Sequence, residues 1–551
     1  MGEWSATAIA ANDLIGSVLY TVGVTVAVAG QWAPVSLLLV CGVVCLFRFI
    51  FSEVGTCVPL NGGCYSLMLV ASTKLFAAIA ACCSILDYAS TAVVSAASAS
   101  IYFQGQWGLI DILPATMGVL AVFALLSMLG MRESAGVSLG IFSLHVATLL
   151  TLVGASVYHI AREGSGVLTA NWSEPTPSGN TALDIFYGFC VGMLGVTGFE
   201  TSANYIEEQK PGVFPKTMRN MSYLVLFFNP VITFLALGVL SRETIVANQN
   251  NVLSILGAVT IGYGMQVAVA VDAVIVLCGG VLTAFVGVVG LIHAMASDRL
   301  LPAFLLLRNK KTHTPQYIIL SFLVLNLLLV AVTDGDITSL SLVFSLSFLF
   351  VLLMFAIANI LLKYKRGRLH RDVVAGWGTV LIGLATVIAA IVGNAVYNPQ
   401  MVGTFSIFFS LLMGVMTLVL YKVPLLKLVL FFVDKGRNSF WDRVGEFVMR
   451  WLRRMQAPPV AFFTNHEQIN VLNKAVLYVK ANEPTKRIIF VHCYDDESAI
   501  PQNLEAHCHI LDHIFPKIQI DLVLVKTTFS PVAVAAIARR LGVNQVSLSL
   551  V

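Results

Sequence analysis

Twelve long apolar runs constrain the fold of this chain more than any other feature. Each is close to the length of about 20 residues that a helix needs to cross a bilayer. The whole chain is 58% hydrophobic and only 11% charged, whereas soluble domains carry about 25% charged residues. The sequence therefore predicts an all-α polytopic membrane protein with twelve transmembrane helices. The runs cover residues 6–29, 33–54, 75–102, 112–130, 135–160, 185–206, 220–240, 264–296, 316–333, 338–362, 373–395 and 401–421.

The charges of the connecting loops predict how these helices are oriented. An even number of spans puts both termini on one side of the membrane. If that side is the cytoplasm, the inner short loops contain fourteen Lys and Arg residues and the outer loops contain two, Arg162 and Arg242. Short cytoplasmic loops carry an excess of positive charge. We therefore expect a multi-pass integral membrane protein with both termini cytoplasmic, by default in the plasma membrane.

The outer loop after the fifth span contains the triplet Asn171-Trp172-Ser173. This is an acceptor sequence for N-glycosylation in a secreted or surface loop. Such triplets are common by chance, and this one would be used only in a eukaryote.

A change of composition after residue 421 predicts three segments. Residues 1–421 form the twelve-helix domain. Residues 422–464 are basic and amphipathic, which favours a helix on the membrane surface and is equally compatible with a solvated linker. Residues 465–551 alternate strand-like and helical patterns, so we expect a small cytosolic α/β domain. This segment contains no Gly-rich phosphate loop, so we predict no nucleotide site in it.

Two of the apolar runs carry glycines where a continuous helix is expected. The sixth reads GVTGFETSAN from residue 195, and the first contains Gly16-Ser17. Unpaired backbone groups are tolerated in a membrane only where they line a cavity or are buried in protein. Each run starts a set of five spans, and the two sets have opposite orientations, as an inverted five-plus-five repeat requires. Exposed N–H groups would attract an anion and exposed carbonyls a cation. The alternative is a pair of kinks packed against small residues.

Four segments carry a family resemblance. They are Ile15-Gly16-Ser17, FSEVGTCVPLNGGCYSLM (51–68), GFETSANYIEEQKPGVFPKTMRN (198–220) and MASDRLLPAFLLLRNKKTHTPQ (295–316). In this order, residues 6–421 resemble amino acid permease-like members of the amino acid–polyamine–organocation (APC) superfamily of transporters. The resemblance implies the leucine-transporter fold, a ten-helix inverted repeat with two further helices. The segment from 465 looks like the C-terminal soluble extension of some members.

The resemblance also implies a substrate site at the two interruptions. Backbone N–H groups of residues 16–18 would bind a substrate carboxylate, and carbonyls of the same two stretches would bind its amine. Val18 replaces a usual glycine of the family and Val196 a frequent aromatic residue, which suggests a roomier or differently closed pocket. The implied substrate-binding residues are Ile15, Gly16, Ser17, Val18, Gly195, Val196, Thr197 and Gly198.

Ionisable residues inside membrane spans are functional candidates by default. Asp13, Asp87, Glu200 and Asp272 lie in the first, third, sixth and eighth spans. Each could bind a cationic group, carry a proton, or serve as a hydrogen-bond partner inside the bundle. For Glu200 we favour the structural role, because an acid after Gly-Phe is common in the family. Arg48 in the second span is a candidate partner of one acid.

His145 in the fifth span is a candidate for proton coupling. By the resemblance, it falls where many proton-coupled relatives place a lysine. An unperturbed histidine titrates at about pH 6.5, so its charge can change near physiological pH. The alternative is a core histidine that is hydrogen-bonded to a neighbouring helix.

Together these features predict a secondary active transporter, not an enzyme. We expect it to move amino acids with protons by alternating access around the interrupted helices. A polyamine or organic-cation transporter is one alternative, favoured by the intramembrane acids. A transporter-like substrate sensor that signals through residues 465–551 is another. We expect a small-molecule substrate, protons and the bilayer as partners, with no cofactor, metal or nucleic acid.

Overall fold

The computed structural model describes most of the chain, in two compact units, Met1–Met416 and Thr417–Val551. Each is described by itself. The described residues are 1–108, 111–130, 135–298, 300–333, 337–422, 425–426, 428, 459–465, 467–482, 485, 487–496, 500–541 and 548–550.

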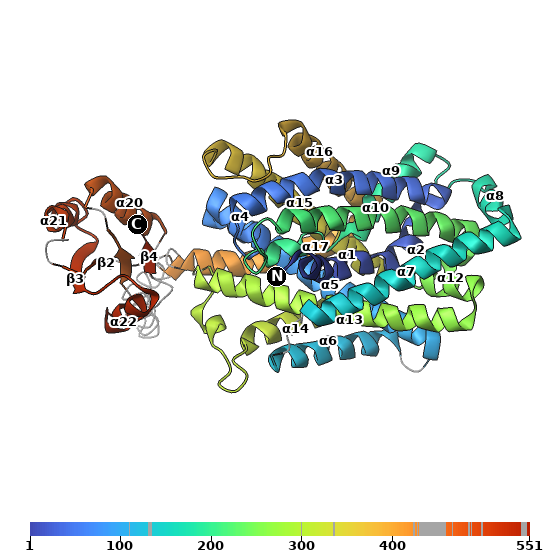
Figure 1. Cartoon of the computed structure of the whole chain (residues 1–551), viewed down its shortest axis with the longest axis horizontal. Helices are drawn as coiled ribbons and strands as arrows, with labels where there is room; N and C mark the ends of the chain where they lie inside the picture. The colour runs from blue at the N-terminus through green and yellow to red at the C-terminus, as the bar shows by residue number, and fades with distance from the viewer. Residues whose placement is uncertain are drawn as a thin grey trace, which may run out of the picture. The chain divides into compact units, whose positions relative to one another are not determined.

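The first unit is a bundle of long helices that run beside one another (Figure 1). Within the described residues, nine stretches are long and apolar enough to cross a membrane. The first of them, Glu3–Cys57, contains two predicted spans. Two shorter apolar helices, Ile112–Met128 and Gln316–Val332, occupy the fourth and ninth predicted spans. The predicted set of twelve transmembrane helices is therefore confirmed.

The helices fall into two sets of five and a final pair. The first set is α1 (Glu3–Gly16) with α2 (Val18–Ala29), α3 (Ala33–Cys57), α5 (Lys74–Trp107), α6 (Ile112–Met128) and α7 (Ala135–Glu163). The second set is α9 (Thr181–Gly192) with η2 (Met193–Val196) and η3 (Thr201–Asn204), α10 (Phe214–Val239), α13 (Tyr263–Ser297), α14 (Gln316–Val332) and α15 (Ile337–Lys365). The final pair is α16 (Trp377–Tyr397) and α17 (Pro399–Leu420). Short connecting helices are η1 (Gly30–Trp32), α4 (Gly63–Ala71), α8 (Gly166–Ser173), α11 (Arg242–Ala247), α12 (Val252–Thr260) and η4 (Ala303–Leu306).

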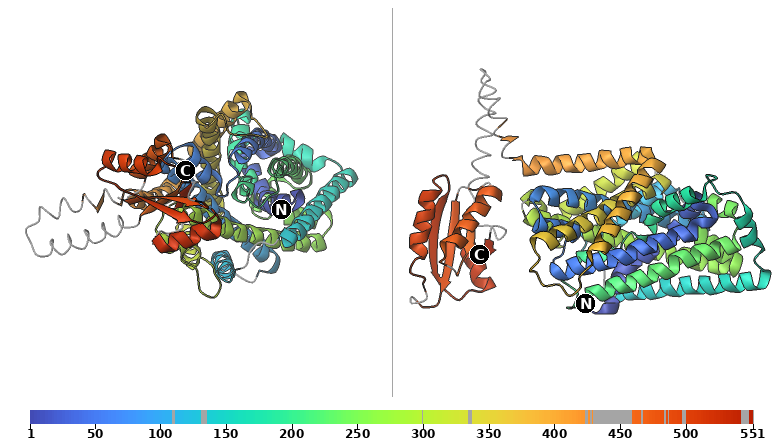
Figure 2. Two further views of the ribbon diagram at one scale, coloured as in Figure 1. Left: turned by 60° about the vertical axis from the view of Figure 1, so that its left-hand side comes forward. Right: turned by 90° about the horizontal axis from the view of Figure 1, so that it is seen from above.

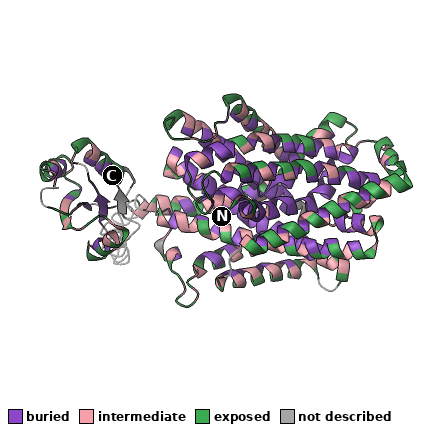
Figure 3. Cartoon of the chain, in the orientation of Figure 1, coloured by how far each residue is buried: buried purple, intermediate pink, exposed green. Residues whose placement is uncertain are grey.

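Helix α5 lies at the centre of this bundle. In its most apolar 18-residue stretch, 94% of the residues are buried, whereas the share in the corresponding stretch of α17 is 17%. Helix α5 packs along α13 and α15. The α5 sequence STAVVSAASAS (90–100) consists mainly of small residues, which let neighbouring helices approach closely in a membrane. The outer helices α6, α7 and α16 instead show exposed faces (Figure 3). The bundle therefore has a well-packed interior and an apolar periphery suited to lipid.

The second unit is a parallel sheet with helices on both faces (Figure 2). The strand order is β3-β2-β1-β4, and every neighbouring pair is parallel. Side chains alternate along β1: Val460 and Phe462 pack towards α20 and α21, whereas Ala461 and Phe463 pack towards α22. A parallel sheet that is covered on both faces needs such apolar strands. The elements are β1 (Val460–Phe463), α20 (Ile469–Asn482), β2 (Arg487–Tyr494), α21 (Leu504–Ile514), β3 (Gln519–Lys526), α22 (Pro531–Leu541) and β4 (Leu548–Leu550).

The predicted α/β tail is confirmed, with one difference at its start. Strand β1 lies between β2 and β4 in the sheet, yet the sequence assigns residues 460–463 to the linker. The α/β unit therefore includes the end of the segment 422–464. Most of that segment lies outside the described residues, so the membrane-surface helix stays a prediction.

Candidate functional site

The first span is interrupted at a single residue. Helix α1 ends at Gly16 and α2 begins at Val18, with Ser17 between them in a right-handed helical conformation. The Ser17 N–H donates to the Leu14 carbonyl, three residues back, instead of the usual four. The Ser17 hydroxyl lies 2.6 Å from the Leu14 carbonyl oxygen and 2.8 Å from that of Gly195. The predicted break therefore affects a single residue, Ser17. The hydroxyl of Ser17 bonds to the sixth span.

The sixth span is interrupted over a longer stretch. Helix α9 ends at Gly192 and a 3₁₀ turn follows, after which Thr197 is extended and Gly198 has a φ of +89°. A Cβ atom at Gly198 would lie 2.7 Å from Asp13 Oδ2. Glycine is required here both because of the left-handed backbone and because the first span approaches so closely.

The two interruptions meet each other. The Gly195 carbonyl accepts from the Ser17 hydroxyl and, at 2.7 Å, from the Asn229 amide of α10. The Tyr20 hydroxyl lies 3.5 Å from Thr197 Oγ1. Residues 15–18 and 195–198 are all buried. The structure thus brings the predicted substrate-binding stretches together, with the Gly195 carbonyl already bonded to two protein donors.

Three acids lie at this meeting point, and we call Asp13, Asp87 and Glu200 the carboxyl cluster. Thr201 Oγ1 donates to Asp13 Oδ2 at 3.1 Å, and the carboxyl groups of Asp87 and Glu200 lie close enough to interact electrostatically. Asp87 and Glu200 are only 2% and 6% exposed. Within the described residues, neither forms an ion pair with Lys or Arg. Like charges that are buried close together repel each other, so this cluster favours the binding of a cation or a proton.

His145 lies in a second polar pair, between α7 and α13. Its Nδ1 is 2.7 Å from Asp272 Oδ2, and both residues are buried. His145 Nε2 and Asp272 Oδ1 have no hydrogen-bond partner within the described residues. Val276 lies one turn after Asp272 on α13. Its Cγ1 atom would lie only 3.0 Å from a Cβ atom added at Gly16. The pair is therefore close to the first-span interruption.

The structure also contains a buried ion cluster around Glu53 that was not predicted from the sequence. Lys363 Nζ and Arg371 Nη1 lie 2.8 Å and 3.1 Å from the two Glu53 carboxylate oxygens. The Asn359 amide and the Ala375 N–H also donate to Glu53 Oε2. The acid-Gly motif at 53–55 was the available signal, but nothing in the sequence pointed to partners more than 300 residues away.

Arg48 does not pair with an intramembrane acid, so that prediction is wrong. Its guanidinium lies over the rings of Phe49 and Tyr223. No described carboxylate is within ion-pair distance of it. Arg48 is half-buried beside exposed rings, whereas Asp87, Glu200 and Asp272 are buried.

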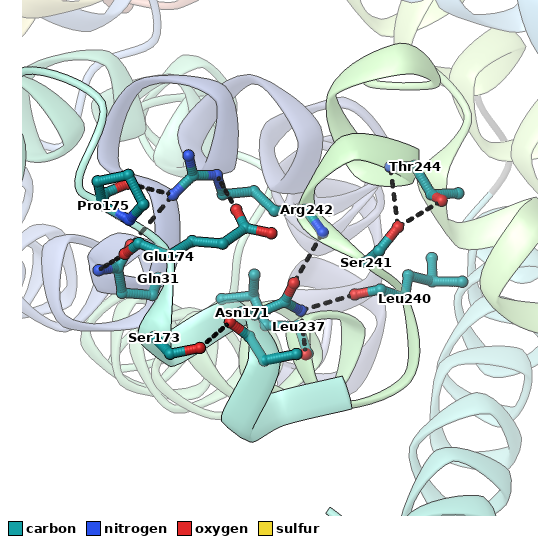
Figure 4. Close-up of polar contacts among 11 residues, drawn as sticks. Gln31, Asn171, Ser173, Glu174, Pro175, Leu237, Leu240, Ser241, Arg242 and Thr244 are labelled. Carbon is teal, nitrogen blue, oxygen red and sulfur yellow. Dashed lines mark hydrogen bonds and ion pairs between the residues drawn. The ribbon is translucent and has the colours of Figure 1, made fainter. Parts of the chain in front are cut away.

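Asn171 of the predicted glycosylation triplet is buried at the end of α8 (Figure 4). Its side-chain nitrogen donates to the Leu237 and Leu240 carbonyls at 2.7 Å and 2.8 Å, and its oxygen accepts the Arg242 N–H. The amide nitrogen, which would carry a glycan, is thus fully used. Beside it, the Arg242 guanidinium pairs with Glu174 at 3.0 Å.

No metal centre is evident in the described part of the chain. No group of three or more His, Cys, Asp or Glu side chains there is arranged to hold a metal ion.

Comparison with solved structures finds transporters. A crystal structure of the Eremococcus coleocola manganese transporter, in complex with an aromatic bis-isothiourea substituted compound, has 14% sequence identity and a TM-score of 0.49. The match covers 76% of this chain and 92% of that one. Two mutants of the same transporter match with 13% identity and the same TM-score and coverage. A search of curated proteins gave no significant match.

Comparison with protein families covers most of the chain. A family described as amino acid permease matches residues 1–419, the region of the twelve spans. This match confirms the predicted family resemblance, and the protein is a membrane transporter. The chain belongs to the amino acid permease family of the APC superfamily.

Proposed function

We propose that this protein is a secondary active transporter that moves amino acids across the membrane with protons. It alternates access around the meeting point of the first and sixth spans. The observation that most supports this proposal is the carboxyl cluster, which lies where Ser17 and Gly195 bond to each other. We also infer from loop charge that both termini are cytoplasmic, and we expect the plasma membrane.

The amine of the substrate is the group that the carboxyl cluster would recognise. Within the described residues, Asp87 and Glu200 form no ion pair with Lys or Arg, and such buried acids can be stabilised by an ammonium group. The Gly195 carbonyl is a weaker candidate, because a substrate would have to displace the Ser17 hydroxyl and the Asn229 amide from it. The substrate carboxylate would bind N–H groups of residues 16–18, as the family resemblance implies.

Proton coupling has two candidate sites with different consequences. A symporter needs the proton and the substrate bound at the same time, so separate sites suit it. The His145–Asp272 pair shares no residue with the carboxyl cluster and fits this requirement. A proton carried by Asp87 or Glu200 would lie where the amine would bind, so the amine would displace it, which would favour exchange. We therefore propose His145 with Asp272 as the symport site.

The His145 assignment can be tested by a pair of variants in reconstituted vesicles. His145→Ala should abolish the stimulation of uptake by an inside-alkaline pH gradient. His159→Ala, in the same helix, should retain it. Full stimulation in His145→Ala would exclude this proton site.

A second candidate substrate class is a polyamine or other organic cation. The carboxyl cluster favours it, because three acids can engage more than one amine. Asp87→Asn should abolish polyamine uptake, which needs more than one acid, whereas Asp13 and Glu200 can still bind the single amine of a neutral amino acid. The matched control is Asp184→Asn. Asp184 is a buried acid in the first turn of α9 and accepts a hydrogen bond from the Ser178 N–H. Equal loss in both variants would show that the effect is structural.

A further inference from the structure

Arg48 is half-buried and places a permanent positive charge beside two exposed aromatic rings. Its guanidinium carbon lies 4.8 Å from the centroid of the Phe49 ring and 5.9 Å from that of Tyr223. These rings are 41% and 57% exposed. Because both belong to membrane-spanning helices, their exposed surface faces lipid. The cation is therefore held at the protein–lipid boundary by two aromatic side chains.

The position of Arg48 along α3 indicates its depth. Cys41, two helical turns earlier on the same face, bonds the Val225 carbonyl of α10, so Arg48 lies along the contact of α3 with α10. It is nine residues from the end of α3 at Cys57, and Tyr223 is nine residues from the start of α10 at Phe214. At 1.5 Å per residue both lie about 13 Å from those helix ends. Loop charge predicts that these ends are cytoplasmic, which puts the pair in the inner leaflet.

A charge at this depth requires a partner, and the described protein residues supply none. No described carboxylate pairs with Arg48. The Tyr223 hydroxyl has no hydrogen bond within the described residues either. A guanidinium can give two parallel hydrogen bonds to phosphate oxygens, and the tyrosine hydroxyl can give a third. Long basic side chains reach towards the headgroups from such positions.

We propose that Arg48 and Tyr223 form a binding site for the phosphate of an anionic phospholipid in the inner leaflet. The acyl chains of this lipid pack along the apolar surface of α3 and α10. A lipid with net negative charge binds in preference to a zwitterionic one, because the headgroup ammonium of the latter competes with the guanidinium for the phosphate and repels it. The site is independent of the substrate site and of the transport activity proposed above.

Native mass spectrometry of the full chain in detergent tests this site. Phosphatidylglycerol or phosphatidylcholine with the same acyl chains is added, and the retained lipid is counted over a concentration series. The wild type should retain phosphatidylglycerol more strongly than phosphatidylcholine. Arg48→Gln should weaken phosphatidylglycerol binding about tenfold, since a hydrogen bond to a charged group contributes at least that factor. Tyr223→Phe should weaken it less.

The matched control is Arg368→Gln, which removes an exposed arginine from the loop after α15 and should leave lipid binding unchanged. The proposal is overturned if Arg48→Gln retains phosphatidylglycerol as the wild type does. It is also overturned if Arg368→Gln loses as much, or if the wild type does not distinguish the two lipids. Because Tyr223→Phe only removes a hydroxyl at the surface, it tests the site even if Arg48→Gln does not fold.

Discussion

Neutralising Glu53 should destabilise the bundle strongly. In Glu53→Gln the side chain keeps its shape but loses the charge that faces Lys363 and Arg371. The exposed fractions of the three side chains are 2%, 7% and 12%, so water screens this cluster little. Removing one member of a buried ion group costs about 3–5 kcal/mol, because it leaves the partner charges uncompensated. We expect a loss of that size in the free energy of unfolding.

An exposed ion pair with similar geometry provides the control. Glu174 pairs with Arg242 at 3.0 Å, but the Glu174 side chain is 42% exposed. Exposed pairs contribute about 0–1 kcal/mol, so Glu174→Gln should cost no more than that. Both variants are compared by denaturant titration of the purified protein in detergent. Adding Lys363→Met to Glu53→Gln should recover part of the loss. The reasoning fails if Glu53→Gln costs no more than Glu174→Gln.

Three further predictions concern other parts of the chain. Gly198→Ala should abolish uptake, because the new Cβ would lie 2.7 Å from Asp13 Oδ2 and the left-handed backbone adds about 1–2 kcal/mol; normal uptake would contradict this. Expression in a eukaryotic host should give no glycosidase-sensitive mobility shift from Asn171, because its amide is buried and bonded. Burial, followed by the charge of Glu505, raises the pKa of the Cys508 thiol to about 11. The folded tail thus disfavours the thiolate relative to the unfolded chain, in which the thiol has a pKa of about 8.5. The contribution of this thiol to the stability of the fold is therefore complete below about pH 8.5 and is lost as the pH rises towards about 11. Alkylation of Cys508 in the full chain should be slow at pH 8 and rise about tenfold per pH unit.

The spans were predictable because a bilayer imposes one rule on every crossing segment. A helix must satisfy its own backbone hydrogen bonds over about 20 apolar residues. The run 75–102, for example, matches α5 at Lys74–Trp107. The interruption at Gly198 was also predictable, because three glycines recur at every third position up to Gly198, whereas a single glycine such as Gly154 leaves α7 continuous.

The partners of buried charges could not be predicted in the same way. His145 and Asp272 are 127 residues apart, and Glu53 is still farther from Lys363. Each residue can be recognised as costly in a membrane, but its partner depends on how the helices rotate and pack. Arg48 shows the same limit, because hydropathy does not tell the lipid-facing side of a helix from the inner side.

Strand β1 was missed for a different reason. Its four residues, Val460–Phe463, are too few to show a clear period, and they follow a basic segment. Only the pairing with β2 and β4 identifies them as a strand.

Uptake by the purified protein in proteoliposomes tests the central claim most directly. Labelled amino acids are offered in one set and polyamines in another, each with and without an inside-alkaline pH gradient. We predict that amino acids accumulate and that the gradient stimulates their uptake. Accumulation of polyamines alone would replace the amino acid assignment by the cation one. Failure of the folded protein to accumulate either class would contradict the proposal that it is a transporter of amines with protons.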